Sequence, residues 1–180
     1  MKLTNAEKLI LMLLSDIHEK LKIDSDIDPI FIKDALQSGQ DWSLAWKFEP
    51  LFSTEEIPQH VRDVGNYLTM WRMLEQAYKK LNAEDEDRVK KEVGFHDDGI
   101  SFKGFDGNGE PEHLSAAEFM IEKLGRFQEF KGRDLNSHAP MLNGYERMYS
   151  AYETIRASSI DANLGADQII TILQAGKYRI

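Results

Sequence analysis

The first pattern along the chain is a set of apolar residues at helical spacing near the N-terminus. These residues recur every three or four positions, which is the period of one helix face: Leu9, Ile10, Leu13, Leu14, Ile17 and Leu21. Thr4 and Glu7 form a capping box just before them and mark where the helix begins. The run is too short to span a bilayer and lacks a secretory cleavage site. We therefore interpret it as a core helix of a soluble, cytoplasmic protein without membrane contacts.

Two shorter helices are predicted next. Asp28 is placed to cap the first, and Gly39 suits the residue just beyond its end. The second carries Trp42 and Trp46 four residues apart on one face. The pair has the outline of a helix-turn-helix, but a DNA-reading helix would offer arginines and amides rather than tryptophans. Helix packing is the favoured interpretation, and a DNA-linked regulator acting through the 29–48 helix pair remains an alternative.

The longest helical pattern runs from Pro58 to about Asn82 and follows a second capping box at Ser53 and Glu56. Its apolar positions cover more than half of its circumference, which is typical of a helix at the centre of a fold. They are Tyr67, Met70, Trp71, Leu74, Ala77, Tyr78 and Leu81. We expect this helix to be the hub of the core.

The remaining elements are predicted to be mostly helical. A highly charged helix follows Asn82, and the helical period then breaks around Asp98-Gly99, which favours a small β-hairpin near 93–105. Further helices are predicted over 110–127, from Pro140 onward, and over about 166–174. The chain is thus predicted to be an all-α, or nearly all-α, bundle of six to eight helices in one domain over residues 1–180.

Composition and charge exclude several classes of function. The net charge is −9 and no quarter of the chain is net positive, so the basic surface of a nucleic-acid binder is missing and no nucleic-acid partner is expected. The absence of cysteine excludes disulfides, thiol nucleophiles and cysteine-ligated metals. It suits a reducing compartment.

Catalytic and cofactor motifs are also missing. The sequence contains no phosphate loop, no dinucleotide-binding glycine fingerprint, no G-x-S-x-G nucleophile turn and no H-E-x-x-H pair. Glu110 and His113 form an E-x-x-H pair, but a di-metal bundle needs two of them and further inward glutamates. We predict no catalytic residue, metal or cofactor, and we favour a non-enzymatic protein.

The stretch GFDGNGE, residues 104–110, raises the question of a calcium loop. Asp106, Asn108 and Glu110 fit the first, third and fifth positions of such a loop. Pro111 then takes the place of the required glycine, and Ala117 takes the place of the bidentate glutamate. We therefore interpret the stretch as a turn before a helix, with Asn108 as its cap.

A group of polar residues lies in or beside the two loops that flank the 110–127 helix. They are Asp106, Asn108, Arg126, Asn136, His138 and Arg147. Loops held on a rigid helical scaffold often carry function. These residues are candidates for a ligand-binding site, and the alternative is that they cap helices and bridge loops.

Several stretches together resemble the YfbU-like family of small bacterial proteins. They are LTNAEKLILMLL, YLTMWRMLEQAY, FKGFDGNGE, GRFQEF and LNSHAPMLNGYERM, in this order along nearly the whole chain. The resemblance implies a bacterial, cytoplasmic, helical protein of one domain, and it implies no reaction. The family-like polar residues in this sequence are Asp106, Asn108, Arg126, Asn136, Tyr145 and Arg147.

Three hypotheses about function follow. The leading one is a non-enzymatic interaction module whose partner is a second copy of itself, because the many large apolar residues can leave a patch for a dimer interface. The second is a small-molecule-binding protein or unrecognised enzyme that uses the loops around Asp106 and Asn136. The third is the DNA-linked regulator.

Overall fold

The computed structural model describes residues 3–48, 57–94, 100–158 and 164–177. Within these ranges the chain forms eight α-helices and one 3-10 turn, and no regular strand. The elements are α1 (Asn5–Leu21), α2 (Pro29–Gln37), α3 (Trp42–Lys47), α5 (Gln59–Tyr78), α6 (Ala83–Val93), α7 (Pro111–Glu122), the turn η1 (Gln128–Phe130), α8 (Leu142–Ser158) and α9 (Ala166–Gly176). The all-α prediction is confirmed.

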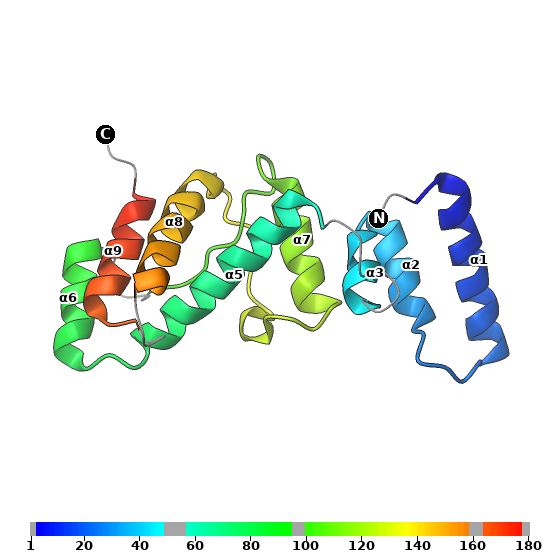
Figure 1. The fold of residues 1–180 in the computed structure, drawn as a ribbon, viewed down its shortest axis with the longest axis horizontal. Coiled ribbons are helices and arrows are strands. Elements are labelled where there is room, and N and C mark those ends of the chain that lie inside the picture. Colours follow the sequence, from blue (N-terminus) through cyan, green and yellow to red (C-terminus); the bar gives the residue numbers. More distant parts are fainter. Residues whose placement is uncertain (1–2, 49–56, 95–99, 159–163, 178–180) are drawn as a thin grey trace.

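The helices are arranged in an elongated row (Figure 1). α1 lies at one end, next to α2 and α3, while α7 and α5 lie in the middle and α8, α9 and α6 at the far end. The main packing pairs are α1 with α2, α5 with α7, α8 with α9 and α6 with α9. No helix in the described part of the chain is long and apolar enough to cross a membrane.

The helix α5 is the hub of the body, as predicted. It packs against α7, α8 and α9, and Val64, Leu68 and Leu74 on it are fully buried. The helix ends at Tyr78, one turn before the predicted end, because Asn82 instead caps α6 by accepting a hydrogen bond from the Asp85 amide at 2.9 Å. The predicted capping box at residues 53 and 56 lies outside the described residues.

An aromatic cluster fills the space between α5, α8 and the segment that leads into α7. Tyr145 of α8 is at its centre, and its ring centroid lies 5.7 Å from those of Trp71, Phe102 and Phe105. Phe130 extends the cluster, at 5.4 Å from Phe102. These side chains are all buried. The aromatic content noted in the sequence is therefore core packing.

The hairpin predicted near 93–105 is wrong for the part that the structure describes. Val93 belongs to α6 rather than to a strand, and Phe105 forms an isolated parallel bridge with Asn136. The Phe105 amide donates to Leu135 at 2.9 Å, and the Ser137 amide donates to Phe105 at 3.1 Å. Alternating apolar residues suggested a local strand pair, but their partner is a segment thirty residues later. The proposed turn at Asp98-Gly99 lies outside the described residues.

The buried carboxylate of Glu75 fastens the segments before α7 and after η1 to the hub. Glu75 of α5 is 7% exposed, and the guanidinium of Arg133 donates to both of its carboxylate oxygens at 2.8 Å. The amide of Phe102 donates to the same carboxylate at 2.9 Å. The hydrogen bonds with Glu75 raise the pKa of Arg133 above its usual value. One carboxylate thus organises two loop segments at once.

Replacing Arg133 with methionine is expected to lower the free energy of unfolding by about 2–4 kcal/mol, because it leaves the Glu75 carboxylate buried without its counter-charge. Arg133→Lys keeps the charge but loses the two-pronged geometry, so we expect an intermediate loss. Urea denaturation followed by circular dichroism measures both. The double variant Arg133→Met/Glu75→Gln should be more stable than Arg133→Met alone; a double variant that is equally or less stable contradicts the argument.

Candidate interaction surface

The predicted helix at the N-terminus is present, but its place in the core is not. The α1 capping box forms as expected, with the Thr4 amide donating to Glu7 at 2.8 Å and the Glu7 amide donating to the Thr4 hydroxyl at 3.3 Å. The apolar positions that define the helix are nevertheless exposed, from 50% for Ile17 to 68% for Leu21. The interpretation of α1 as a core helix is therefore wrong.

The apolar stripe is exposed because α1 uses its other, narrower face to pack against the rest of the protein. α1 packs on α2, with Ser15 buried and with Leu11 and Met12 half-buried on the side opposite to the exposed stripe. Lys33 of α2 forms ion pairs with Asp16 and Glu19 along the edge of this contact. In Figure 1, α1 is the outermost helix of the row, so its wide apolar side faces away from the body.

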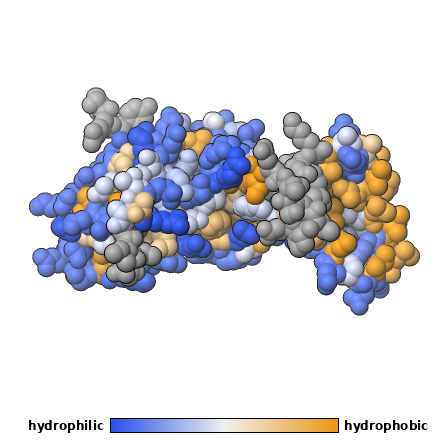
Figure 2. All heavy atoms as spheres, in the orientation of Figure 1, coloured by the Kyte–Doolittle hydropathy of each residue, from blue (hydrophilic) through white to orange (hydrophobic). Residues whose placement is uncertain are grey.

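Exposed apolar side chains also occur past the end of α1, in the following turn and at the start of α2. Its residues, named the hairpin face below, are Leu9, Ile10, Leu13, Leu14, Ile17, Leu21, Ile23, Ile27 and Ile30. Among the described residues, no large hydrophobic side chain outside this face is exposed to a similar extent. Figure 2 shows the hydrophobic colour concentrated over this end of the molecule.

The area of the hairpin face is that of an interface. At roughly 100 Å² for each half-exposed leucine or isoleucine, the nine side chains offer on the order of 900 Å², against about 800 Å² per partner in a standard interface. The largest apolar patch on a typical monomer is about 300–600 Å². The face therefore exceeds what an isolated protein usually leaves in water.

The charges beside the hairpin face are mainly acidic. Asp24, Asp26 and Asp28 lie in the turn between α1 and α2, and all three are exposed. Asp28 caps α2 by accepting from the Ile30 and Phe31 amides at 3.1 Å, as predicted, and its carboxylate pairs with Lys47 at 3.3 Å. We name residues 24–28 the acidic turn.

The loops around Asp106 and Asn136 do meet in space, but their polar side chains bind backbone groups. Asp106 is buried and accepts from the amides of Asn108 and Gly109 at 3.1 and 3.2 Å. Asn136 accepts from the amides of Gly107 and His138 at 3.1 and 3.0 Å. The calcium-like stretch is thus a turn, as predicted, although Asp106 rather than Asn108 stabilises it.

Glu110 connects these loops to α8. Its carboxylate accepts from the amides of Met141 and Leu142 at 2.7 and 2.8 Å and from the Asp106 amide at 3.0 Å. The side chain is only 6% exposed. The E-x-x-H pair therefore does not supply a free ligand, because its glutamate holds the start of α8.

The two arginines of the candidate ligand site lie away from these loops. Arg126 follows the far end of α7, and its guanidinium lies over the Trp46 ring, 4.5 Å from the centroid. Arg147 on α8 donates to the carbonyls of Ala175 and Gly176 at 2.9 and 2.8 Å and so caps the end of α9. The structure brings Asp106, Asn136 and their neighbours together but not the arginines.

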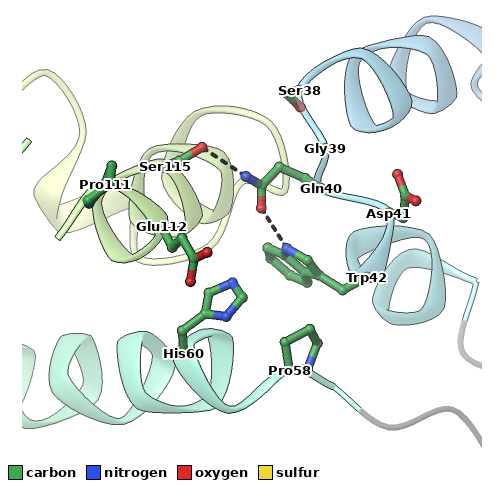
Figure 3. A pocket seen from close by; sticks show the side chains of 10 residues that line it. All are labelled: Ser38, Gly39, Gln40, Asp41, Trp42, Pro58, His60, Pro111, Glu112 and Ser115. Atoms are coloured by element: carbon green, nitrogen blue, oxygen red, sulfur yellow. Dashed lines mark hydrogen bonds between the residues drawn. The ribbon is translucent and has the colours of Figure 1, made fainter. Parts of the chain in front are cut away.

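A pocket of about 430 Å³ lies where the turn between α2 and α3 meets the starts of α5 and α7 (Figure 3). Gln40 crosses it, donating to the Ser115 hydroxyl at 2.8 Å and accepting from the Trp42 indole at 2.6 Å. Glu112 and His60 point toward one another beside this chain of hydrogen bonds. Gln40, Ser115 and Trp42 are hydrogen-bonded to one another. These bonds connect the turn between α2 and α3 with α7, so they join the N-terminal helices to the body.

Burial shifts the pKa values of three ionisable ring groups near the core. Burial, with the Asp63 carboxylate nearby, raises the pKa of Tyr67 to about 12, and burial also raises the pKa of Tyr145. Burial, with His60 nearby, lowers the pKa of His113, whose ring packs 5.7 Å from that of Phe105. Neutral phenols and a neutral imidazole in aromatic packing are typical of a core.

The short helix α3 does not favour the DNA alternative. Trp42, Ser43, Leu44 and Ala45 are buried, and Trp42 packs edge-on against Trp46 at 5.2 Å as the sequence suggested. The exposed Lys47 already pairs with Asp28. Little of α3 is left to enter a groove.

Sequence reasoning identified the apolar helix positions of the hairpin face but did not predict that they are exposed. Helical periodicity shows which residues share a face, yet it does not show whether another part of the same chain covers that face. A usable signal was present in the turn, where Ile27 lies between Asp26 and Asp28. Carboxylates on both sides of an apolar residue are typical of surface rather than of core.

Comparison with known proteins gives a family match over nearly the whole chain. A model of the YfbU domain matches residues 1–175. The chain is also similar to the UPF0304 protein MJECS11 of Methanocaldococcus jannaschii. The two are 28% identical over an alignment of 180 positions, which covers 96% of this chain and 99% of that protein. Because this relative is archaeal, the bacterial origin expected from the sequence stays a prediction.

Proposed function

We propose that this protein, which belongs to the YfbU family, is a non-enzymatic interaction module, homodimeric in its simplest form, whose contact surface is the hairpin face. The observation that carries the proposal is the concentration of exposed large hydrophobic side chains between residues 9 and 30. Exposed leucine and isoleucine on this scale cost free energy in water, and a partner that covers them recovers it.

The loops around Asp106 and Asn136 support the non-enzymatic form. A small-molecule site or active site there would need polar groups directed at a ligand. The carboxylate of Asp106 instead accepts from backbone amides of its own loop, and the amide oxygen of Asn136 accepts from the Gly107 amide of that loop and from the His138 amide of its own. Such contacts stabilise the loops themselves. The binding or enzymatic alternative would have to displace them.

The proposal predicts that the hairpin face is covered in cells. The chain has no cysteine, so Leu13→Cys introduces a single thiol on the face. A face that is occupied 90% of the time reacts with a maleimide about tenfold more slowly, because only the free fraction reacts. We expect this slowing in whole cells that express the variant at native level.

The matched control is Gln76→Cys, at an exposed position on α5 far from the hairpin. Denaturant in the lysate should bring both thiols to the same labelling rate. Equal rates for Leu13→Cys and Gln76→Cys in the intact cells would mean that nothing covers the face, and the proposed function would fail.

A further inference from the structure

We infer that the partner on the hairpin face is α1 of a second copy of this chain, running antiparallel across a twofold axis that passes near Leu13. This inference rests on the proposed function and adds the identity and direction of the partner helix. In such an arrangement the same patch serves both subunits, so the patch must be complementary to itself.

The chemistry of the face fits a second copy. Its large side chains are leucines and isoleucines without an aromatic anchor, and Ile10, Leu13 and Ile17 form a central seam with spacings of three and four residues. Such seams interdigitate with an identical helix. With α2 supporting each α1 from behind, two copies would form a bundle of four helices.

Other occupants fit less well. A helix that lies on a membrane surface is typically rich in lysine and arginine on its polar face. Here Lys20 and Lys22 are exposed at the end of α1, but the exposed Glu7, Asp16 and three aspartates of the acidic turn outnumber them, so this end is net acidic. An anionic lipid surface would repel these carboxylates. A second copy presents the same aliphatic seam. It avoids this electrostatic repulsion if its own acidic turn lies away from the acidic turn of the first copy.

The acidic turn determines the direction. In a parallel pair, Asp24 and Asp26 of both subunits would gather at one end of the interface and repel one another. In an antiparallel pair the two turns are separated by about the length of α1, which for 17 residues is about 25 Å, well beyond the Debye length of about 8 Å. Each turn then lies near the positive end of the partner's α1 dipole.

Single cysteines in the seam test this arrangement, since the wild-type chain has none. For an axis near Leu13, an oxidant should link Leu13→Cys to itself, whereas Ile10→Cys and Ile17→Cys alone should stay reduced because their partners are offset by about seven residues, or about 10 Å. A mixture of Ile10→Cys and Ile17→Cys, one of them tagged, should give the mixed disulfide.

The association state provides the second measurement. Sedimentation velocity of the purified protein should show a dimer, and Ile17→Glu should weaken it at least about 100-fold, as at an interface hot spot. Its circular dichroism should be unchanged, because Ile17 is half-exposed in the subunit. Leu114→Ala, a half-buried position in the body, is the control that should leave the dimer intact.

The outcomes separate the two proposals. Self-linking by all three cysteine variants without a mixed disulfide would mean a parallel pair and overturn the antiparallel arrangement. A purified protein that stays monomeric at high concentration would overturn the second copy as partner. If Leu13→Cys is nevertheless protected in cells, the interaction module stands with a different protein on the face; if it is not, both proposals fall.

Discussion

Gly104→Ala is expected to lower the free energy of unfolding by roughly 4–6 kcal/mol, a large part of the stability of a typical domain. A Cβ at this position would lie 1.8 Å from the Leu135 carbonyl oxygen and 2.2 Å from its carbon, and Gly104 has a φ of +84°. Backbone atoms cannot swing aside as a side chain can. The segment would have to leave Leu135, and the two hydrogen bonds of the Phe105 bridge would break with it.

The matched control for this prediction is Gly132→Ala. Gly132 has a similar φ of +77°, but no atom lies within 4 Å of its added Cβ. Alanine there should cost only the strain of the left-handed backbone, about 1–2 kcal/mol. Chemical denaturation followed by circular dichroism compares the stabilities of the two variants. If Gly104→Ala does not fold, its helical circular dichroism signal in the absence of denaturant will be much weaker than that of Gly132→Ala. Losses equal within about 1 kcal/mol would contradict the steric argument.

The contrast between these glycines shows where sequence reasoning stops. Local signals predicted the helices well: the Thr4 capping box, the Asp28 cap and the glycine beyond α2 all form as expected. These signals work because the interacting groups lie within four residues of one another. The sequence does not show that Gly104 touches Leu135, because that contact depends on how α7 and α8 are each placed by packing on α5.

The candidate site shows the same limit in another form. Asp106 and Asn136 were grouped as candidates for one site, and the structure brings their loops together, because Asn136 accepts from the Gly107 amide of the Asp106 loop. Arg126 was grouped with them by its closeness in sequence to α7, yet the helix carries it to the opposite end, over Trp46. Helix length, rather than composition, separates the members of the group.

Exposure is the property that the sequence predicted least well. The stripe of α1 has the same periodicity as the stripe of α5, but α5 lies between three other helices and α1 packs on α2 alone among its main contacts. We propose that both faces are hydrophobic because both are buried. For α5 the burial occurs within the subunit, whereas for α1 we propose that it occurs between subunits.

Glu110→Ala is expected to lower the free energy of unfolding by about 3–5 kcal/mol, because three amides lose the carboxylate that accepts from them at a site where the side chain is 6% exposed. Two of them, from Met141 and Leu142, belong to the start of α8, so a residue more than thirty positions earlier performs the role of a helix cap. Loss of this cap should also speed hydrogen exchange at the amides of Met141 and Leu142 more than at the middle of α8.

Two control variants test whether the loss of stability comes from the Glu110 carboxylate itself. Glu110→Gln keeps one oxygen for the α8 amides but loses the charge that favours a helix N-terminus, so we expect roughly half of the loss. Glu112→Ala removes an exposed carboxylate two residues away and should change stability by no more than about 0.5 kcal/mol. Urea denaturation ranks the three. If Glu110→Ala costs no more than Glu112→Ala, the carboxylate is not what holds the start of α8, and the connection between the Asp106 turn and α8 must rest on the aromatic cluster around Tyr145 instead.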